Sequence, residues 1–233
     1  MPSPTALLTG ASQGLGLALA TALDADGWHL VLDARDGDRL TTAVAGLPFP
    51  DRVTALPGDI ADPAHRAALA DAVPAALDLL VANASDLGPS PLPRLADLPP
   101  AAFERVLAVN TIAPLALAQL LLPALRRAGG RVLLLSSDAA VEAHAGWGGY
   151  GASKAALDHL GAVLAVEEPD LRVYAVDPGD MATAMQQAAF PGEDVSDRPA
   201  PATVVPALLR LVDGALPSGR YRAAALASAG APA

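Results

Sequence analysis

The sequence has no cysteine, few aromatic residues and no excess of positive charge. Without cysteine among its 233 residues, disulfides, thiolate metal sites and thiol nucleophiles are excluded. Lys and Arg number 15 against 25 Asp and Glu, which gives a formal net charge of -10. Nucleic acid is therefore not expected as a partner, because it would need a basic face. An anionic ligand would have to be caught locally, by backbone N–H groups or a placed arginine.

Long uninterrupted hydrophobic runs are also missing. No apolar run reaches membrane-spanning length without a proline, a glycine or a charge, and the chain starts without the basic segment of a signal peptide. We therefore expect a soluble, cytoplasmic protein without a membrane partner. With 52% hydrophobic and 17% charged residues, the chain can bury a substantial core, so residues 1–233 are predicted to form one α/β domain.

Short apolar runs alternate with helical stretches along the whole chain. The expected strands cover residues 5–9, 29–34, 53–57, 77–82, 131–136, 172–176 and 220–225. This alternation predicts a doubly wound parallel sheet with helices on both faces. Ligands of such sheets bind beyond the carboxyl ends of the strands. Five positions that each follow a strand should therefore converge on one cleft: Gly10, Asp59, Asn83, Ser137 and Pro178.

A glycine-rich turn follows the first expected strand and opens a helix. Its glycines are Gly10, Gly14 and Gly16, and Ser12, Gln13 and Leu15 lie between them. Glycines at this place allow a tight turn and close approach of the backbone to a pyrophosphate, while the helix N-terminus offers free N–H groups. The turn favours dinucleotide binding over a plain loop.

The end of the second expected strand carries an acidic and a basic residue, and each would favour a different dinucleotide. An acid there would bind a ribose 2′-hydroxyl, whereas an arginine would meet a 2′-phosphate. Asp33 and Arg35 flank Ala34, so composition leaves the choice open. Asp36 is expected to cap the next helix, with Arg39 on its surface.

Tyr150 and Lys154 are four residues apart in a stretch without proline, so they should lie on one face of a helix. A cation about 4 Å from a phenol, at an effective dielectric of ~20, favours phenolate by roughly 4 kcal/mol. This corresponds to a pKa lowered by up to about three units before desolvation is subtracted. A phenol tuned in this way can exchange a proton with a substrate oxygen near neutral pH.

Other segments give plainer expectations. Residues 101–125 are predicted to form one long helix, in which Pro114 should cause a kink or leave a carbonyl unpaired. His65 is expected on a helix surface. A short helix is expected over residues 203–211, a mobile substrate flap near 183–201, and a loose tail from residue 226. His144 could suggest a serine hydrolase, but no G-x-S-x-G elbow supports that reading.

Taken together, these residues resemble the short-chain dehydrogenase/reductase family in its compact single-domain form, from residue 5 to about 225. The matching pieces, in chain order, are the 9–16 glycine turn, Asp59, the Asn83-Ala84 pair, Asn110, Ser137, Tyr150, Lys154, Pro178-Gly179 and Thr183. The resemblance implies a seven-stranded Rossmann fold and a carbonyl/alcohol oxidoreductase that uses a nicotinamide dinucleotide.

The resemblance also implies roles for single residues. Tyr150 would be the acid/base, Lys154 would hold the nicotinamide ribose, Ser137 would orient the substrate oxygen, and Asn110 would bind a water connected to Lys154. The implied cofactor contacts are Gly10, Ser12, Gln13, Gly14, Leu15, Gly16, Ala34, Arg35, Asp59, Ile60, Asn83, Ala84, Tyr150, Lys154, Pro178, Gly179, Met181 and Thr183. No metal is implied.

Arg35 stands where NADP-preferring relatives carry a basic residue, so NADP(H) is favoured, and Asp33 keeps NAD(H) open. Asp33 is expected to point away from the cofactor. Ser85 replaces the usual glycine after the Asn-Ala pair. A dinucleotide sensor that has lost turnover is the alternative to an enzyme. The family also implies a homodimer or homotetramer, assembled through the helices that carry Asn110 and Tyr150.

The substrate itself is a small molecule that the sequence does not specify. Side chains with a place near the expected pocket are Ser85, Asp138, Ala140, Glu142, Trp147, Met181, Met185 and Phe190. If Asp138 and Glu142 face the cleft, they should disfavour an anionic substrate.

Overall fold

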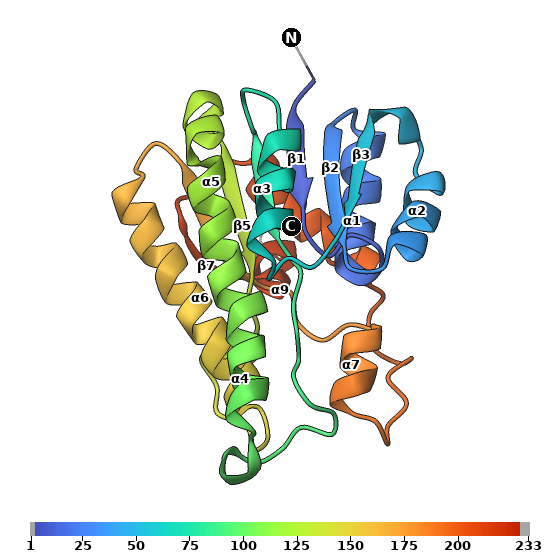
Figure 1. Ribbon diagram of the computed structural model, residues 1–233, viewed down its shortest axis with the longest axis vertical. Helices are drawn as coiled ribbons and strands as arrows, with labels where there is room; N and C mark the ends of the chain where they lie inside the picture. The colour runs from blue at the N-terminus through green and yellow to red at the C-terminus, as the bar shows by residue number, and fades with distance from the viewer. Residues whose placement is uncertain (1–2, 229–233) are drawn as a thin grey trace.

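A computed structural model of the protein describes residues 3–228. Seven parallel strands form one sheet in the order β3-β2-β1-β4-β5-β6-β7 (Figure 1). Their bounds are β1 Thr5–Leu8, β2 His29–Ala34, β3 Val53–Pro57, β4 Leu79–Ala82, β5 Arg131–Leu135, β6 Arg172–Asp177 and β7 Gly219–Arg222. The predicted doubly wound parallel sheet in a single domain is confirmed.

The central strands are apolar on both faces, as strands covered on two sides must be. In β4, Leu79 and Val81 point into one hydrophobic cluster, and Leu80 and Ala82 point into the other. All four residues are buried. This explains why the central strands appear in the sequence as continuous apolar runs without polar alternation.

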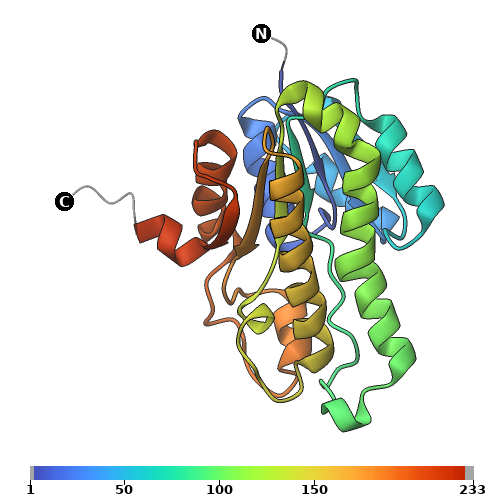
Figure 2. The same ribbon diagram turned by 90° about the vertical axis from the view of Figure 1, so that its left-hand side faces the viewer.

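Helices cover the two faces of the sheet. They are α1 Gly14–Ala25, α2 Gly37–Ala45, α3 Pro63–Ala72, α4 Pro100–Leu107, α5 Ala113–Ala128, α6 Gly148–Glu167, α7 Ala184–Ala189, α8 Val205–Asp213 and α9 Ala223–Ser228. Residues of α1, α2 and α8 build one cluster, and residues of α3, α5 and α6 build the other. Figure 2 shows the C-terminal helices (red) on one side and α5 and α6 (green and gold) on the other.

The chain changes direction across the sheet at β1, which pairs with β2 on one side and with β4 on the other. The connection after β1 leads to α1 on one face of the sheet, and the connection after β4 leads to α4 and α5 on the other, and sheets of this kind bind ligands at the carboxyl edge beside such a point. α4 and α7 extend beyond the sheet at the same end (Figure 1). This end holds the site described below.

The helix predicted over residues 101–125 lies within the continuous helical stretch Pro100–Ala128, and the disturbance expected at Pro114 takes the form of a wider turn. α4 ends at Leu107, a π-helical segment covers Ala108–Ile112, and α5 follows. In an α-helix the carbonyl of residue i accepts from the N–H of residue i+4, and Pro114 has no N–H to offer Asn110. The wider turn resolves this conflict, and the Ala113 N–H bonds to the Ala108 carbonyl five residues earlier.

The continuous helical stretch Pro100–Ala128 is, by length and composition, apolar enough to cross a membrane. Half of its most apolar window is buried inside the protein. Val109, Ala113, Leu117 and Leu121 pack in the cluster that covers the sheet. Packing on the sheet therefore accounts for the buried half of this apolar surface.

The C-terminal expectations need correction. The last strand is Gly219–Arg222 instead of 220–225, because α9 begins at Ala223. Leu226 is 5% exposed within α9, so the predicted loose tail does not start there; residues 229–233 lie outside the described part of the chain. The helix predicted at 203–211 is α8, with Pro206 in its first turn as expected. The segment predicted as a flap contains α7.

Candidate functional site

A cleft of about 720 Å³ opens at the carboxyl edge of the sheet. Most residues predicted to bind a dinucleotide or to act in catalysis line it: Gly10, Ser12, Gln13, Gly14, Leu15, Ala34, Arg35, Asp59, Ile60, Asn83, Ala84, Ser137, Tyr150, Lys154, Pro178, Gly179, Met181 and Thr183. Gly16 and Asn110 do not line it. The predicted convergence of strand ends on one cleft is therefore seen in the structure.

The glycine turn has the geometry that a bound pyrophosphate requires. Gly10 and Gly14 have φ angles of 67° and 57°, in the left-handed region that favours glycine. A Cβ on Gly16 would lie 2.3 Å from the Gly10 carbonyl oxygen, so only glycine allows the helix to approach the turn this closely. Gln13 makes no side-chain cap to α1, which leaves the first-turn N–H groups to a ligand. These residues fit a dinucleotide phosphate.

Thr9 and Asn83 join the loops that follow β1 and β4. The Thr9 hydroxyl accepts hydrogen bonds from the Asn83 N–H at 3.1 Å and the Ala84 N–H at 3.0 Å. The Asn83 amide donates to the carbonyl oxygens of Thr9 at 2.9 Å and Gly10 at 3.0 Å. The Asn83 side chain therefore fixes the floor of the cleft by holding main-chain atoms.

Two arginines from α2 and its preceding turn border the cleft near the end of β2. Arg35 lines the cleft as predicted, and Arg39 lines it beside Arg35. Arg39 Nη1 donates to Gln13 Oε1 at 2.7 Å, which connects α2 to the glycine turn. Arg39 is exposed, as predicted, whereas its position in the cleft wall was not predicted. Asp36 caps α2 as predicted, by accepting from the Arg39 N–H.

Asp59 forms an ion pair that the sequence did not reveal. Its carboxylate accepts from the Ala61 N–H at 2.9 Å and lies 2.9 Å from Arg105 of α4. Desolvation raises the pKa of Asp59, but the Ala61 hydrogen bond and Arg105 outweigh it and leave the pKa below its ordinary value. Arg105 also lines the cleft. Asp59 is therefore a charged carboxylate held in place at the cleft wall.

His65 is not the surface residue that the sequence predicted. Its Nε2 lies 2.6 Å from Oδ1 of Asp33, and the two side chains are 9% and 2% exposed. Asp33 lines the cleft floor beside Ala34. Desolvation raises the pKa of Asp33, and the interactions with His65 and the Gly10 backbone oppose the rise.

Ser137, Tyr150 and Lys154 come together where β5 and α6 meet. Tyr150 and Lys154 share one face of α6, as predicted, and are 8% and 2% exposed. Lys154 Nζ donates to the Leu135 carbonyl at 2.7 Å and lies 5.5 Å from the centre of the Tyr150 ring. A Cβ on Gly151 would lie 2.5 Å from the Ala139 carbonyl oxygen, so this glycine lets α6 approach the loop that carries Ser137.

The predicted lowering of the Tyr150 pKa by Lys154 is not found. Burial raises the pKa of Tyr150 to about 12; hydrogen bonds with Ser85 and Ser137 oppose the rise, while Asp138 and Asp177 add to it. Burial lowers the pKa of Lys154 to about 8, with Asp158 opposing. Desolvation is therefore the largest cause of both shifts, and the Tyr150 phenol is protonated at neutral pH.

Asn110 is fully buried in the π-helical segment, and its side chain organises the protein framework beside the cleft. Its amide donates to the Asp86 carbonyl at 2.8 Å and to the Ser153 hydroxyl at 2.9 Å. Its Oδ1 accepts from the Asp86 N–H at 2.7 Å and from the Ser85 hydroxyl at 3.2 Å. The side chain thus joins the loop after β4 to α6 and has no capacity left for a ligand.

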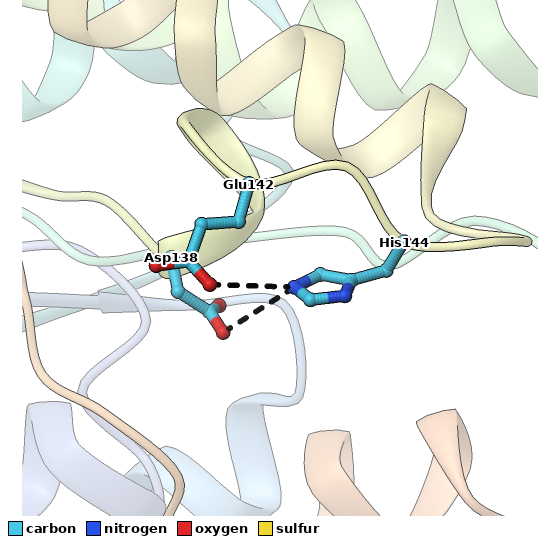
Figure 3. Close-up of side chains that lie close together, drawn as sticks. All are labelled: Asp138, Glu142 and His144. Atoms are coloured by element: carbon cyan, nitrogen blue, oxygen red, sulfur yellow. Dashed lines mark ion pairs between the residues drawn. The ribbon is translucent and has the colours of Figure 1, made fainter.

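Asp138, Glu142 and His144 form an exposed cluster in the segment that follows β5 (Figure 3). His144 Nε2 lies 3.9 Å from Asp138 and 4.0 Å from Glu142, and Glu142 also pairs with Arg222. The Ser137 hydroxyl donates to Asp138 Oδ1 at 2.7 Å. The Ser137 hydroxyl bonds to a carboxylate, and no hydrogen bond joins it to the His144 imidazole in the described residues, so this arrangement gives no support to a serine hydrolase.

The predicted substrate-pocket residues divide into two groups. Ser85, Asp138, Trp147, Met181 and Met185 line the cleft, whereas Ala140, Glu142 and Phe190 do not. The Trp147 ring lies edge-on to Tyr150 at 5.7 Å and 6.0 Å from the Phe190 ring. Phe190 therefore contributes behind Trp147 instead of in the cleft.

Comparison with known proteins decides the family. The sequence profile of the short chain dehydrogenases matches residues 4–194 of the chain. The chain belongs to the short-chain dehydrogenase family. It is therefore an oxidoreductase, and its cofactor is a nicotinamide dinucleotide. The resemblance drawn from the glycine turn and the Tyr150–Lys154 pair is confirmed.

Relatives from several organisms support this assignment. The chain is 31% identical over 218 residues to the uncharacterised oxidoreductase YciK of Escherichia coli, covering 88% of this chain and 84% of that protein. It is 33% identical over 191 residues to a benzil reductase of Saccharomyces cerevisiae that forms (S)-benzoin, covering 78% and 73%.

Solved structures of the family superpose closely. An alcohol dehydrogenase from Thermococcus sibiricus, complexed with 5-hydroxy-NADP, matches with a TM-score of 0.84 at 27% identity and covers 95% of this chain and 96% of its own. A protein assigned to the short-chain dehydrogenases from Escherichia coli, complexed with NADPH, matches with a TM-score of 0.86 at 29% identity and covers 96% and 97%.

Proposed function

We propose that this protein is an NADP(H)-dependent oxidoreductase that interconverts a carbonyl and a secondary alcohol, with Tyr150 as the acid/base. The observation that carries the proposal is the placement of Ser137, Tyr150 and Lys154 in the same cleft as the glycine turn. The benzil reductase relative supports it, because that enzyme turns a ketone into an alcohol.

Each side chain has a separate task in this mechanism. The bound dinucleotide supplies or accepts the hydride. Ser137 hydrogen-bonds the substrate oxygen and orients it, and the neutral Tyr150 phenol delivers a proton to that oxygen. Because burial raises the pKa of Tyr150 to about 12, the phenol carries the proton that carbonyl reduction needs. Lys154 lies beneath the phenol, where it would hold the nicotinamide ribose together with Tyr150.

The glycine turn, the α1 N-terminus, Asp59 and Thr183 would hold the rest of the dinucleotide. The choice of NADP(H) over NAD(H) rests on Arg35 and Arg39, which bring two positive charges to the rim at the end of β2. Guanidinium groups bind phosphate with charge-assisted hydrogen bonds. The neighbours complexed with NADPH and 5-hydroxy-NADP support the same choice.

The substrate pocket combines an apolar wall with one acid. Leu87, Trp147 and Met185 pack around Tyr150, and Asp138 lies beside Ser137. An apolar wall favours a substrate with an aromatic or aliphatic body. The Asp138 carboxylate disfavours anionic substrates by charge repulsion. We therefore propose an uncharged or cationic ketone or aldehyde.

Replacing Tyr150 by Phe tests the mechanism. General acid–base catalysis contributes about 10²- to 10⁴-fold, so Tyr150→Phe should lower kcat by at least about 100-fold while the NADPH dissociation constant changes little. The assay is NADPH oxidation across a panel of neutral ketones and aldehydes, with binding followed by NADPH fluorescence. Tyr221→Phe removes a phenol that bonds to the Pro217 carbonyl and serves as the matched control. Unchanged turnover in Tyr150→Phe would remove this residue from the reaction.

A further inference from the structure

Arg220 of β7 connects three segments of the candidate site, although it does not line the cleft itself. Its Nη2 donates to the Ser137 carbonyl at 2.8 Å, and its Nε donates to Asp158 Oδ2 of α6 at 2.9 Å. Nη2 also lies 3.9 Å from Asp177 Oδ2 at the end of β6. A single guanidinium group thus joins the segment after β5 to α6 and to the end of β6.

Strand alternation turns the Arg220 side chain toward this side of the sheet. Tyr221 packs against the hydrophobic cluster that contains residues of α1 and α8. The residues before and after it therefore face the side that α6 covers. Arg222 lies there too, paired with Glu142 and 3.7 Å from Asp177. Because β6 lies between β5 and β7, only a long side chain from β7 can reach Ser137.

The ion pair of Arg220 with Asp158 is shielded from water. The two side chains are 27% and 14% exposed. Asp158 lies one turn after Lys154 on α6, and its charge raises the pKa of that lysine against the effect of burial. Arg220 therefore balances the charge of a carboxylate that acts on Lys154. Removing one partner of such a pair leaves an uncompensated charge behind.

The bond to the Ser137 carbonyl fixes the chain at the point where it leaves β5. The same carbonyl accepts from the Ala140 N–H at 3.2 Å, in the short turn that Ser137 caps. A donor on this carbonyl sets the orientation of the Ser137 main chain, and with it the direction of the hydroxyl. Since α6 carries both Asp158 and Tyr150, the Arg220 bridge sets Ser137 relative to the phenol.

We propose that Arg220 is a positioning residue for the reaction, which holds the Ser137 main chain against α6 and so aligns the Ser137 hydroxyl with the Tyr150 phenol. The inference rests on the proposed function for the roles of Ser137 and Tyr150. Arg220 lies outside the cleft and acts through Ser137. A displacement of about 1 Å in a group that orients the substrate can cost about 100-fold in rate.

The first test measures hydride transfer in Arg220→Met by single-turnover NADPH oxidation. The ketone is the one that wild type reduces fastest in a panel of neutral ketones, with benzil tried first. The rate constant should fall at least about tenfold, while the NADPH dissociation constant changes little. In a Ser137→Ala background, Arg220→Met should cause less than about a twofold further loss, because the hydroxyl that it positions is absent.

Arg210→Met is the matched control. It removes a guanidinium that also donates to a main-chain carbonyl, that of Leu226, between α8 and α9. This variant should keep the wild-type rate. Thermal unfolding confirms that each variant is folded. An unchanged rate in folded Arg220→Met overturns the proposal, and so does a loss that is equally large in the Ser137→Ala background.

A further variant separates positioning from the buried charge. Arg220→Met leaves the Asp158 carboxylate without its guanidinium partner beside Lys154. The double variant Arg220→Met with Asp158→Asn removes that charge and should remain slow, because the Ser137 carbonyl still lacks its donor. If Asp158→Asn restores the rate, the loss came from the carboxylate and the proposal fails.

Hydrogen exchange follows the Ser137 segment without turnover. The N–H groups of Ala140, Val141 and Glu142 bond to the carbonyls of Ser137 and Asp138. Exchange in a peptide that covers residues 138–142 should become about tenfold faster in Arg220→Met and stay unchanged in Arg210→Met. If wild type oxidises NADPH with no ketone of the panel, the proposed function fails. Exchange still decides whether Arg220 holds Ser137, since an unchanged rate of exchange in Arg220→Met overturns the inference.

Discussion

At the residue scale, the buried lysine gives a pH dependence of stability. Lys154 titrates at about pH 8 in the folded protein, below the ordinary 10.5, because burial disfavours its charge. Between these values the folded chain has released a proton that the unfolded chain still holds. The unfolding free energy therefore rises with pH in this window.

We expect wild type to gain stability over Lys154→Met as the pH rises from about 7 to about 10. The gain should be on the order of 2–3 kcal/mol, since one pKa unit corresponds to about 1.36 kcal/mol. Urea unfolding of both proteins at the two pH values measures it. The raised pKa of Tyr150 acts in the opposite direction above about pH 10, and the tyrosine is present in both proteins. A difference that stays constant with pH would show that Lys154 keeps an ordinary pKa.

A second residue-scale prediction concerns Arg35. If this guanidinium holds the 2′-phosphate, Arg35→Ala should lower kcat/KM with NADPH at least about tenfold and leave the value with NADH nearly unchanged, because only NADPH loses a charged hydrogen bond. Steady-state kinetics with each dinucleotide measures this. Arg172→Ala, at the start of β6 and thus at the opposite end of the strand from the cleft, is the control. Equal losses with both cofactors would place Arg35 outside the 2′-phosphate site.

At the element scale, the π-helical segment is the feature with a direct test. Pro114→Ala supplies an N–H that the Asn110 carbonyl could accept in an α-helix. The segment should then tighten, shift Asn110 relative to Asp86 and Ser153, and lower kcat about tenfold or more without lowering the melting temperature. Circular dichroism melting and initial rates measure both effects. Pro123→Ala, at an exposed position inside α5, should leave the rate unchanged. An unchanged rate in Pro114→Ala would show that catalysis does not depend on the wider turn.

The elements that the sequence predicted well are those with one dominant physical signal. Continuous apolar runs predicted the central strands, and the caps Asp36 and Asp62 predicted helix starts. The sequence failed where two tendencies compete. Residues 220–222 favour a strand, whereas the alanines that follow favour a helix, and the structure changes from β7 to α9 between Arg222 and Ala223.

Some features of the candidate site could likewise be predicted from the sequence, and others could not. The residues after each strand could be assigned to one cleft because parallel strands end at one edge. The contact between Asp33 and His65 could not be predicted from the sequence, because the two residues are 32 positions apart and only their side chains meet. The pKa values of Tyr150 and Lys154 could not be predicted either, because the extent of burial is a property of the folded protein.

At the scale of the whole molecule, exposed apolar side chains gather on the helices that carry the predicted interface. Ile112, Leu115, Val163 and Val166 are 55%, 37%, 40% and 81% exposed. Figure 1 shows α5 and α6 side by side on one face of the molecule. Exposed apolar groups of this kind support assembly of two or four copies, which stays a prediction, as does the cytoplasmic location.

Val163→Arg tests the assembly. A charge placed in an apolar interface without a partner is costly to bury, so the variant should dissociate at least about tenfold more readily. Sedimentation velocity across a concentration series measures the shift from oligomer to monomer. Val141→Arg changes an equally apolar side chain, 58% exposed in the loop after β5, and should leave the assembly intact. A wild-type protein that sediments as a monomer would contradict the prediction.

The hydroxyl of Thr9 has a consequence for how ligands reach the cleft. It accepts hydrogen bonds from two successive backbone N–H groups in the segment after β4. It thereby holds the segments after β1 and β4 together at the base of the cleft. The 183–201 wall is held to its surroundings largely through side chains: the Ser90 hydroxyl donates to the Ala188 carbonyl, Arg198 lies 4.0 Å from Asp180, and Phe190 packs against Trp147. We therefore expect admission and release to proceed by movement of the 183–201 wall over a fixed base. Dinucleotide and substrate would then enter and leave through the same opening. The ligand that binds deeper in the cleft would have to bind first and dissociate last.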